Sequence, residues 1–279
     1  MTASSSTSQY ALGSTDAEHE PPDPAGEISR PSDRTASPGR GHRRRSTGSG
    51  YWLWRGRYRD VSRPLGWQSG EVVGIERDSR SITRARPRVS KAGLLNVSFM
   101  ECDVSQTQSG GPFDAVVGRL ILQFVPDQVA VLHCLSKVVR PGGVLVFQEV
   151  SYAPLLALSA HLPLWSASVS VARETIQRSG ANPEAGVALH RSFQEAGLPP
   201  PTMRMEMLLG NTPDFALWIY DLLCGLRPKI QQHQVSLDEL GDFQALPVRL
   251  QSEVSQSKTV VPYVALVGAW SHKPLSEAS

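Results

Sequence analysis

The chain has 279 residues, with 28 Lys and Arg residues, 26 Asp and Glu residues and a hydrophobic share of 40%. This composition is typical of a soluble globular protein, and no apolar run approaches the roughly 20 residues that a membrane-spanning helix needs. A formal net charge of +2 is too small to indicate binding to nucleic acid. We therefore expect no nucleic-acid partner and no membrane association.

The start of the chain argues against a secreted protein, and the cysteines argue against a protein held by a metal or by disulfides. The start of the chain has neither a basic segment nor an apolar stretch, which argues against a secretory signal and favours the cytoplasm. Cys102, Cys134 and Cys224 are far apart and have no Cys or His neighbours at metal-ligand spacing. We therefore expect neither a metal site nor a disulfide framework.

The segment 1–69 differs in composition from the rest of the chain. Residues 21–50 are rich in Pro, Gly, Ser and Arg and contain almost no large aliphatic side chains. Such a stretch buries too little apolar surface to offset the entropy of an ordered chain. We predict that it is disordered, including the basic run Arg40–Arg45, and that the folded domain spans about 70–275.

From Gly70 onwards, short apolar runs alternate with amphipathic stretches, which is typical of a parallel sheet covered by helices. The run 71–76 is predicted to form a strand, and the helix after it should end or bend at Pro87. Further along, the chain has the patterns of strands at 96–104, at 113–125 passing into a turn, and at 140–150, with a helix at about 126–139.

The last third of the chain combines strands with helical insertions. Strands are predicted at 202–210 and 259–270, and amphipathic helices with aromatic side chains at about 151–182 and 211–257. Repeated strand–helix units predict an α/β fold with a doubly wound sheet. Ligands bind such sheets at the carboxyl ends of the strands, so the site is sought there.

Four segments within residues 70–150 carry a family resemblance: GEVVGIERD, NVSFMECDV, FDAVVGRLILQFVPD and VVRPGGVLVFQEV. In order and spacing they resemble class I S-adenosylmethionine-dependent methyltransferases, especially the small-molecule type similar to quinone-biosynthesis enzymes. The resemblance implies a Rossmann-like, mostly parallel sheet with a reversed last strand. It also implies transfer of a methyl group from S-adenosylmethionine to a small organic acceptor.

The resemblance also assigns cofactor-binding residues. Glu76 resembles the acidic residue that accepts hydrogen bonds from the two ribose hydroxyls, and Asp103 the one that accepts from the adenine amino group. Val104 would present its backbone N–H to the adenine ring, while Gly118 and Arg119 would line the methionine side. Each side chain also has a plainer interpretation: a solvated carboxylate for Glu76, a helix N-cap for Asp103 and a surface ion pair for Arg119. No histidine has a motif around it, so no catalytic base is assigned.

One feature of the family is absent. Its first, central strand ends in a glycine-rich turn of the form D-x-G-x-G-x-G, and nothing before Glu71 has that pattern. The position holds STGSGYWLWRGRYRDVSRPLGWQSG, which contains three of the six tryptophans, Trp52, Trp54 and Trp67. We therefore predict that the central strand is degraded or replaced, with YWLWRGRY as the segment that can take its place.

The genetic code suggests an origin for this segment. The single Trp codon, read from its second base, begins with two guanines and encodes glycine, so all three tryptophans would become glycines. With free choice of synonymous codons, the shifted frame from Thr47 can read R-V-L-D-I-G-C-G-A-G-D, the expected strand and turn. We hypothesise that about residues 21–69 are translated out of frame and that this chain is inactive; a divergent N-terminal extension is the alternative.

Two other functions fit parts of the pattern. An acidic residue after the second strand also suits a nicotinamide-dependent oxidoreductase, and a non-catalytic binding protein would keep the fold without the cofactor. Asp103 one strand later and the terminal pair of strands favour the methyltransferase.

Overall fold

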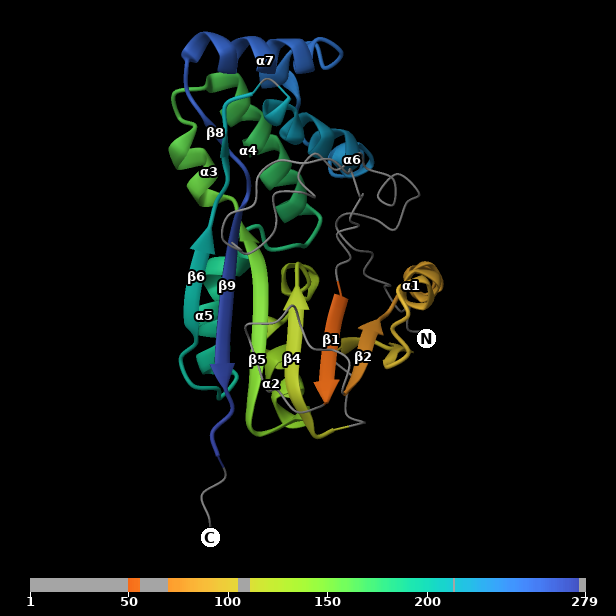
Figure 1. Cartoon of the computed structure of the whole chain (residues 1–279). Coiled ribbons are helices and arrows are strands. Elements are labelled where there is room, and N and C mark those ends of the chain that lie inside the picture. The colour runs from red at the N-terminus through yellow and green to blue at the C-terminus, as the bar shows by residue number, and fades with distance from the viewer. Residues whose placement is uncertain (1–49, 56–69, 105–110, 213, 276–279) are drawn as a thin grey trace, which may run out of the picture. The chain divides into compact units, whose positions relative to one another are not determined.

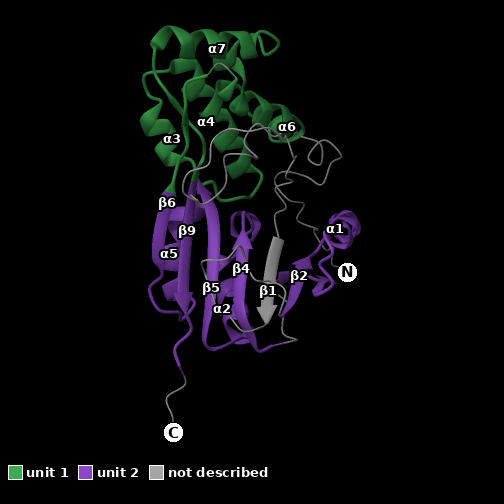
Figure 2. Cartoon of the chain, in the orientation of Figure 1, with its two compact units in different colours: residues 1–48, 152–183, 206–265 green, residues 49–151, 184–205, 266–279 purple. Residues whose placement is uncertain are grey.

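The computed structural model describes the backbone of residues 50–55 and, in full, residues 70–104, 111–212 and 214–275 (Figure 1). Apart from Gly50, the predicted disorder of residues 21–50 lies outside this range. The described residues divide into two compact units (Figure 2). We call them the sheet unit, with residues from 49–151, 184–205 and 266–279, and the helical unit, with residues from 152–183 and 206–265.

The sheet unit contains a seven-stranded sheet in the order β3-β2-β1-β4-β5-β9-β6 among the described residues. Its strands are β1 (Gly50–Arg55), β2 (Glu71–Glu76), β3 (Val97–Glu101), β4 (Phe113–Arg119), β5 (Val139–Ser151), β6 (Thr202–Glu206) and β9 (Ala265–His272). β2 pairs with β3 and β4 pairs with β5 in parallel. Figure 1 shows β9 running opposite to its neighbours β5 and β6. The prediction of a Rossmann-like, mostly parallel sheet with a reversed last strand is confirmed.

The central strand is present but runs in the reverse direction. β1 pairs antiparallel with β2 on one side and with β4 on the other, and Tyr51 is the register partner of both Ile75 and Gly118. The first residues of the segment YWLWRGRY thus occupy the place of the family's first strand. β1 lies outside the range 70–275 that the sequence predicted as the folded domain.

Helices α2 (Gln128–Val138) and α5 (Ala185–Glu195) lie behind the sheet in Figure 1, on one face of it. Their apolar side chains, including Leu132, Leu135 and Phe193, are fully buried in one core with Val116 and Leu145 of β4 and β5. Gly186 permits the close approach of α5, because a Cβ there would lie 2.8 Å from the Val267 side chain and 2.9 Å from the Glu149 carbonyl oxygen.

The expectation that Pro87 ends or bends the first helix is wrong as to its end. Helix α1 spans Ser79–Lys91 and continues for four residues beyond Pro87. Proline removes the N–H that would bond to the carbonyl of Thr83. Both residues are exposed, and at an exposed position water can replace the lost hydrogen bond, so the helix tolerates the proline.

The helical unit contains most of the two predicted insertions. Its helices are α3 (Ala153–Leu158), α4 (Pro163–Arg178), α6 (Trp218–Gln232) and α7 (Leu246–Ser257), with short 3-10 turns η4 (Phe215–Leu217) and η5 (Asp238–Leu240). Trp165 of α4 and Trp218 of α6 pack with ring centroids 5.7 Å apart, and Tyr263 lies 4.8 Å from Trp218. These aromatic side chains form core contacts between the elements of this unit.

The last two predicted strands, 202–210 and 259–270, are each divided in the structure. After β6 the chain forms β7 (Leu209–Gly210), and before β9 it forms β8 (Val261–Pro262); β7 and β8 pair antiparallel in a small sheet of their own. Pro262 has no N–H to donate, which limits that ladder to a short pair. Each predicted strand therefore contributes to two different sheets.

Candidate functional site

The carboxyl ends of β2 and β4 lie at the same edge of the sheet, on either side of β1. Glu76 is the last residue of β2, and Gly118 and Arg119 are the last residues of β4. Because Tyr51 pairs with both Ile75 and Gly118, the two strand ends are level, about 10 Å apart at two strand spacings. The structure thus brings Glu76, Gly118 and Arg119 to one edge.

Glu76 closes the turn that leads into α1. Its Oε1 accepts a hydrogen bond from the backbone N–H of Asp78 at 3.0 Å. Asp78 is the N-cap of α1, and its Oδ1 accepts from the N–H of Arg80 at 3.1 Å. The half-buried Glu76 carboxylate therefore has a local backbone partner, and its assignment to the ribose stays a prediction.

Asp103 and Val104 follow β3 at the same edge. The N–H of Cys102 donates to the Glu76 carbonyl oxygen at 3.1 Å, which joins the turn after β3 to the end of β2. Asp103 is half-buried and Val104 is buried. The chain that would continue from an N-cap at Asp103 lies outside the described residues, so the adenine contact stays a prediction.

The side chain of Arg119 contains a buried nitrogen. Its Nε is inaccessible to solvent, and no described residue accepts a hydrogen bond from it. Among the described residues no carboxylate forms an ion pair with Arg119 either, so the interpretation as a surface ion pair finds no support there. A buried donor without an acceptor is costly, and such groups often mark a ligand or an ordered water.

The turn after β4 is held by a residue that the sequence analysis missed. Glu149 of β5 is fully buried, and its carboxylate accepts the backbone N–H groups of Ile121 at 2.9 Å, Leu122 at 2.8 Å and Gln123 at 3.3 Å. Burial raises the pKa of Glu149 to about 7, while the three hydrogen bonds act in the opposite direction. Leu120 has a φ of 55°, so the chain turns sharply before these donors.

A signal for Glu149 was present in the sequence. The strand RPGGVLVFQEV is otherwise rich in β-branched and apolar residues, and a carboxylate in such a strand needs partners. The pattern does not say which residues these partners are.

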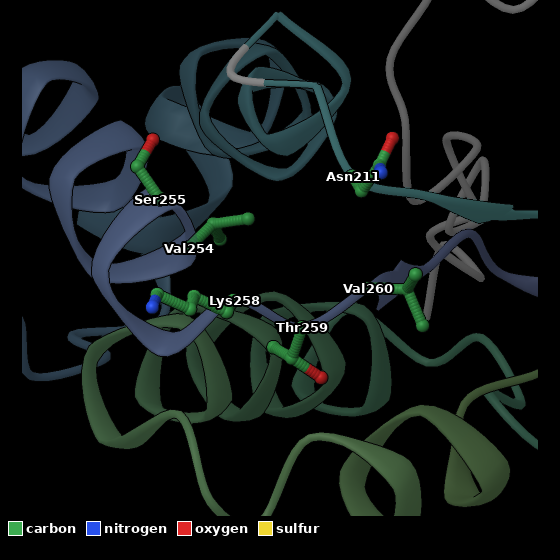
Figure 3. Close-up of a pocket in the computed structure, with 6 residues that line it drawn as sticks. All are labelled: Asn211, Val254, Ser255, Lys258, Thr259 and Val260. Atoms are coloured by element: carbon green, nitrogen blue, oxygen red, sulfur yellow. The ribbon is translucent and has the colours of Figure 1, made fainter.

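The helical unit has a cavity of about 530 Å³, lined by Asn211, Val254, Ser255, Lys258, Thr259 and Val260. Figure 3 shows the polar ends of Asn211, Ser255 and Lys258 lying apart, with no common point toward which they are directed. A ligand site needs a few polar groups that converge on one place. This cavity is therefore not a candidate for the functional site.

Three further features were sought in the described part of the chain: a metal site, a membrane-spanning helix and a histidine that could act as a base. No group of three potential metal ligands occurs there, and no helix there has the length and apolarity that a membrane span requires. His133 lies 3.3 Å from the Ala196 carbonyl oxygen, and His161 lies 3.1 Å from the Thr259 hydroxyl. These contacts give both histidines local polar partners and mark neither as a base.

Comparisons with known proteins agree with this geometry. The family model for the methyltransferase domain matches residues 48–197, more than half of the chain. The chain therefore belongs to the methyltransferase domain family, which implies S-adenosylmethionine as the methyl donor. The match favours a methyltransferase over the nicotinamide-dependent oxidoreductase.

Curated relatives match over shorter stretches. The trans-aconitate 2-methyltransferase of an Azoarcus species is 29% identical over 82 residues, 29% of this chain and 30% of that protein. A ubiquinone/menaquinone biosynthesis C-methyltransferase of Coxiella burnetii is 30% identical over 99 residues, 35% of this chain and 40% of that protein. The chain thus spans less than half the length of these relatives.

Solved structures are similar at low sequence identity. The phosphoethanolamine N-methyltransferase 2 of Haemonchus contortus, in complex with S-adenosyl-L-methionine, is 14% identical with a TM-score of 0.39 and covers 72% of this chain and 43% of that one. The YcgJ protein of Bacillus subtilis is 10% identical with a TM-score of 0.44 and covers 72% of this chain and 82% of that one.

Two of the residues predicted to bind S-adenosylmethionine lie at strand ends of this edge, since Glu76 ends β2 and Arg119 ends β4. Their contacts with the cofactor stay predictions. The glycine turn is not among the described residues. Because β1 is antiparallel to its neighbours, its carboxyl end at Arg55 lies at the opposite edge of the sheet.

Proposed function

We propose that this chain is by descent an S-adenosylmethionine-dependent methyltransferase of the kind that acts on a small organic acceptor, and that it is located in the cytoplasm. The observation that carries the proposal is the placement of Glu76, Gly118 and Arg119 at one edge of a methyltransferase-type sheet. Ligands of doubly wound sheets bind at this edge. The relatives in quinone and trans-aconitate methylation support an acceptor of small-molecule size.

In this proposal the two halves of the donor have separate partners. Glu76, Asp103 and Val104 would hold the adenosine part, and Gly118 and Arg119 would face the methionine part. The bound donor supplies an activated methyl group on its sulfonium. The contribution of the protein is then alignment of donor and acceptor and exclusion of water.

The reversed β1 supports the further proposal that this chain is inactive. A family member needs its glycine turn at the carboxyl edge, directly after the central strand. Here the carboxyl end of β1, at Arg55, lies at the other edge of the sheet, beside Glu71. The same observation favours, as second candidate function, a non-catalytic binding protein that retains the fold.

The direct test compares this chain with a variant whose residues 21–69 carry the shifted reading frame. In the variant, the central strand should run parallel to β2 and β4, bury apolar side chains and end in the glycine turn. The variant should therefore melt at a higher temperature than the present chain. S-adenosylmethionine should raise its melting temperature further. The present chain should gain little. An equal cofactor-induced rise in melting temperature for both would show that the segment around β1 already does the work of the turn.

A substitution tests the adenosine half. Glu76→Ala should weaken S-adenosylmethionine binding by about 1 to 3 kcal/mol in the frame-restored variant, the range for loss of a charged hydrogen-bond partner. Asp103→Ala should have a smaller effect, because one adenine contact replaces two hydroxyl contacts. Glu71→Ala is the matched control, since Glu71 is exposed at the other end of the same strand. Calorimetric affinity unchanged in Glu76→Ala would remove this residue from the site.

A further inference from the structure

We infer that helix α1 docks on a membrane surface that carries anionic phospholipids. The inference goes beyond the proposed methyltransferase function and does not depend on it. It starts from residues 77–91, RDSRSITRARPRVSK, which contain six Arg and Lys residues and one acidic residue, Asp78. The expectation of no membrane association came from the composition of the whole chain, which does not reveal a local excess of charge, and the inference revises that expectation.

Four of these cations lie on one face of α1, because they are spaced by four, four and three residues. They are Arg80, Arg84, Arg88 and Lys91, and we call them the basic stripe. Arg84 is half-buried, and the other three are exposed. Ile82, the buried residue of this helix, lies on the opposite face. The basic stripe therefore points away from the core of the sheet unit.

The basic stripe does not stabilise α1 itself. Like charges four residues apart repel each other within a helix, and a cation in the first turn opposes the helix dipole. Arg80 stands in that turn; its ion pair with Asp78, at 3.2 Å, offsets part of this effect, and its side chain remains 62% exposed. We therefore attribute the basic stripe to an anionic partner rather than to the stability of the helix.

The end of α1 adds exposed apolar side chains close to the basic stripe. The helix ends in a turn at Gly93, which has a φ of 69°, and the N–H of Leu94 donates to the Val89 carbonyl oxygen at 3.1 Å. Leu94 is 40% exposed and Leu95 is 98% exposed. Leu95 follows Lys91 by only four residues, so this apolar tip and the basic stripe can contact one surface together.

A bilayer surface matches this combination. Anionic headgroups attract Lys and Arg side chains, and the attraction adds up over a cluster of about four to eight of them. The layer just below the headgroups accepts leucine side chains. Nucleic acid would offer phosphates to the basic stripe but no apolar layer to Leu95. The anionic lipids face the cytoplasm, which agrees with the proposed location of the chain.

The test is binding of the full chain to phosphatidylcholine vesicles with and without phosphatidylserine, measured by co-flotation. The chain should bind only the vesicles with phosphatidylserine, and less tightly as the salt concentration rises. The triple variant Arg80→Gln, Arg88→Gln, Lys91→Gln should bind about 100-fold more weakly, since each cation contributes about 5-fold and Gln preserves the helix. Leu95→Ser should weaken binding by about 10-fold, because it removes the apolar tip.

The matched control removes three exposed arginines of the sheet unit that lie outside α1: Arg140→Gln, Arg191→Gln and Arg204→Gln. This triple variant loses the same net charge and should keep most of the affinity for the vesicles. Circular dichroism of each variant checks that it is folded.

Three outcomes would overturn the inference. The first is that the wild-type chain does not bind vesicles with phosphatidylserine. The second is an equal loss of affinity in the two triple variants, which would indicate attraction by net charge alone. The third is tighter binding to duplex DNA than to the vesicles, without an effect of Leu95→Ser, which would indicate a nucleic-acid partner.

Discussion

The turns after β2 and after β4 both belong to the predicted cofactor edge, yet they are held in opposite ways. The turn after β2 depends on carboxylates within three residues of their partners: Glu76 accepts from Asp78, and Asp78 accepts from Arg80 and Ser81. The turn after β4 depends on Glu149, whose three donors lie 26 to 28 positions earlier in the chain.

Burial decides the electrostatics of the two turns. Desolvation raises the pKa of Asp78, but its hydrogen bonds from Arg80 and Ser81 outweigh this, and the pKa is lowered from its ordinary value. For Glu149 desolvation outweighs the three hydrogen bonds, and the pKa rises to about 7. The same interaction, a backbone N–H bound to a carboxylate, thus accompanies opposite shifts. We infer that the exposed turn contributes little to stability and the buried turn contributes much.

The largest effect is expected for Glu149→Ala. This change leaves three buried N–H groups without an acceptor and should lower the free energy of unfolding by about 3 to 5 kcal/mol. Urea unfolding measures the loss. Glu195→Ala is the control, since Glu195 is exposed and its described ion pair is with Arg191 on the same helix; its effect should stay below about 1 kcal/mol. A similar loss in both variants would contradict the special role of the buried turn.

The second effect is a dependence of stability on pH. The pKa of Glu149 is about 7 in the folded chain, against an ordinary value of 4.5. Between these pH values the folded state keeps a proton that the unfolded state has released, so stability falls as pH rises. The fall should reach about 3 kcal/mol between pH 4.5 and 8. Glu149→Gln should lack this component, and urea unfolding at several pH values compares the two chains. Parallel profiles would show that Glu149 does not titrate in this range.

The smallest effect is expected at the exposed turn. Asp78→Ala removes the N-cap of α1 and should cost about 1 kcal/mol of stability, measurable as a small fall in the urea midpoint. Asp78→Asn keeps a capping side chain and should recover most of it. A loss as large as that of Glu149→Ala would abolish the distinction between the two turns.

The same contrast explains what the sequence could predict. β2, β3, β4 and β5 were recognisable because each is a short apolar run between turn residues, and the capping residues of α1 and α2 lie beside the helices that they cap. The positions of Glu76, Gly118 and Arg119 at strand ends followed from these elements. Glu149 was missed because its partners are far away along the chain and only the fold brings them together.

The direction of β1 could not be predicted from the sequence either. The pattern of a strand predicts its burial, whereas its direction depends on the neighbours and on the connections at both ends. The division of residues 202–210 and 259–270 between two sheets has the same origin. The continuation of α1 through Pro87 depended on an exposure that periodicity alone did not reveal.

The place of β9 has a consequence for how the chain is made. β9 lies between β5 and β6, although it follows both of them in the sequence. During synthesis on a ribosome, β5 and β6 therefore exist with unpaired inner edges until residues 265–272 have emerged. In the folded protein, the backbone N–H of Lys273 donates to the Gly143 carbonyl oxygen and its Nζ donates to the Val139 carbonyl oxygen, at 2.8 Å each. Unpaired edges invite contacts with other chains, so a nascent chain halted before residue 265 should need chaperone protection that the released protein does not.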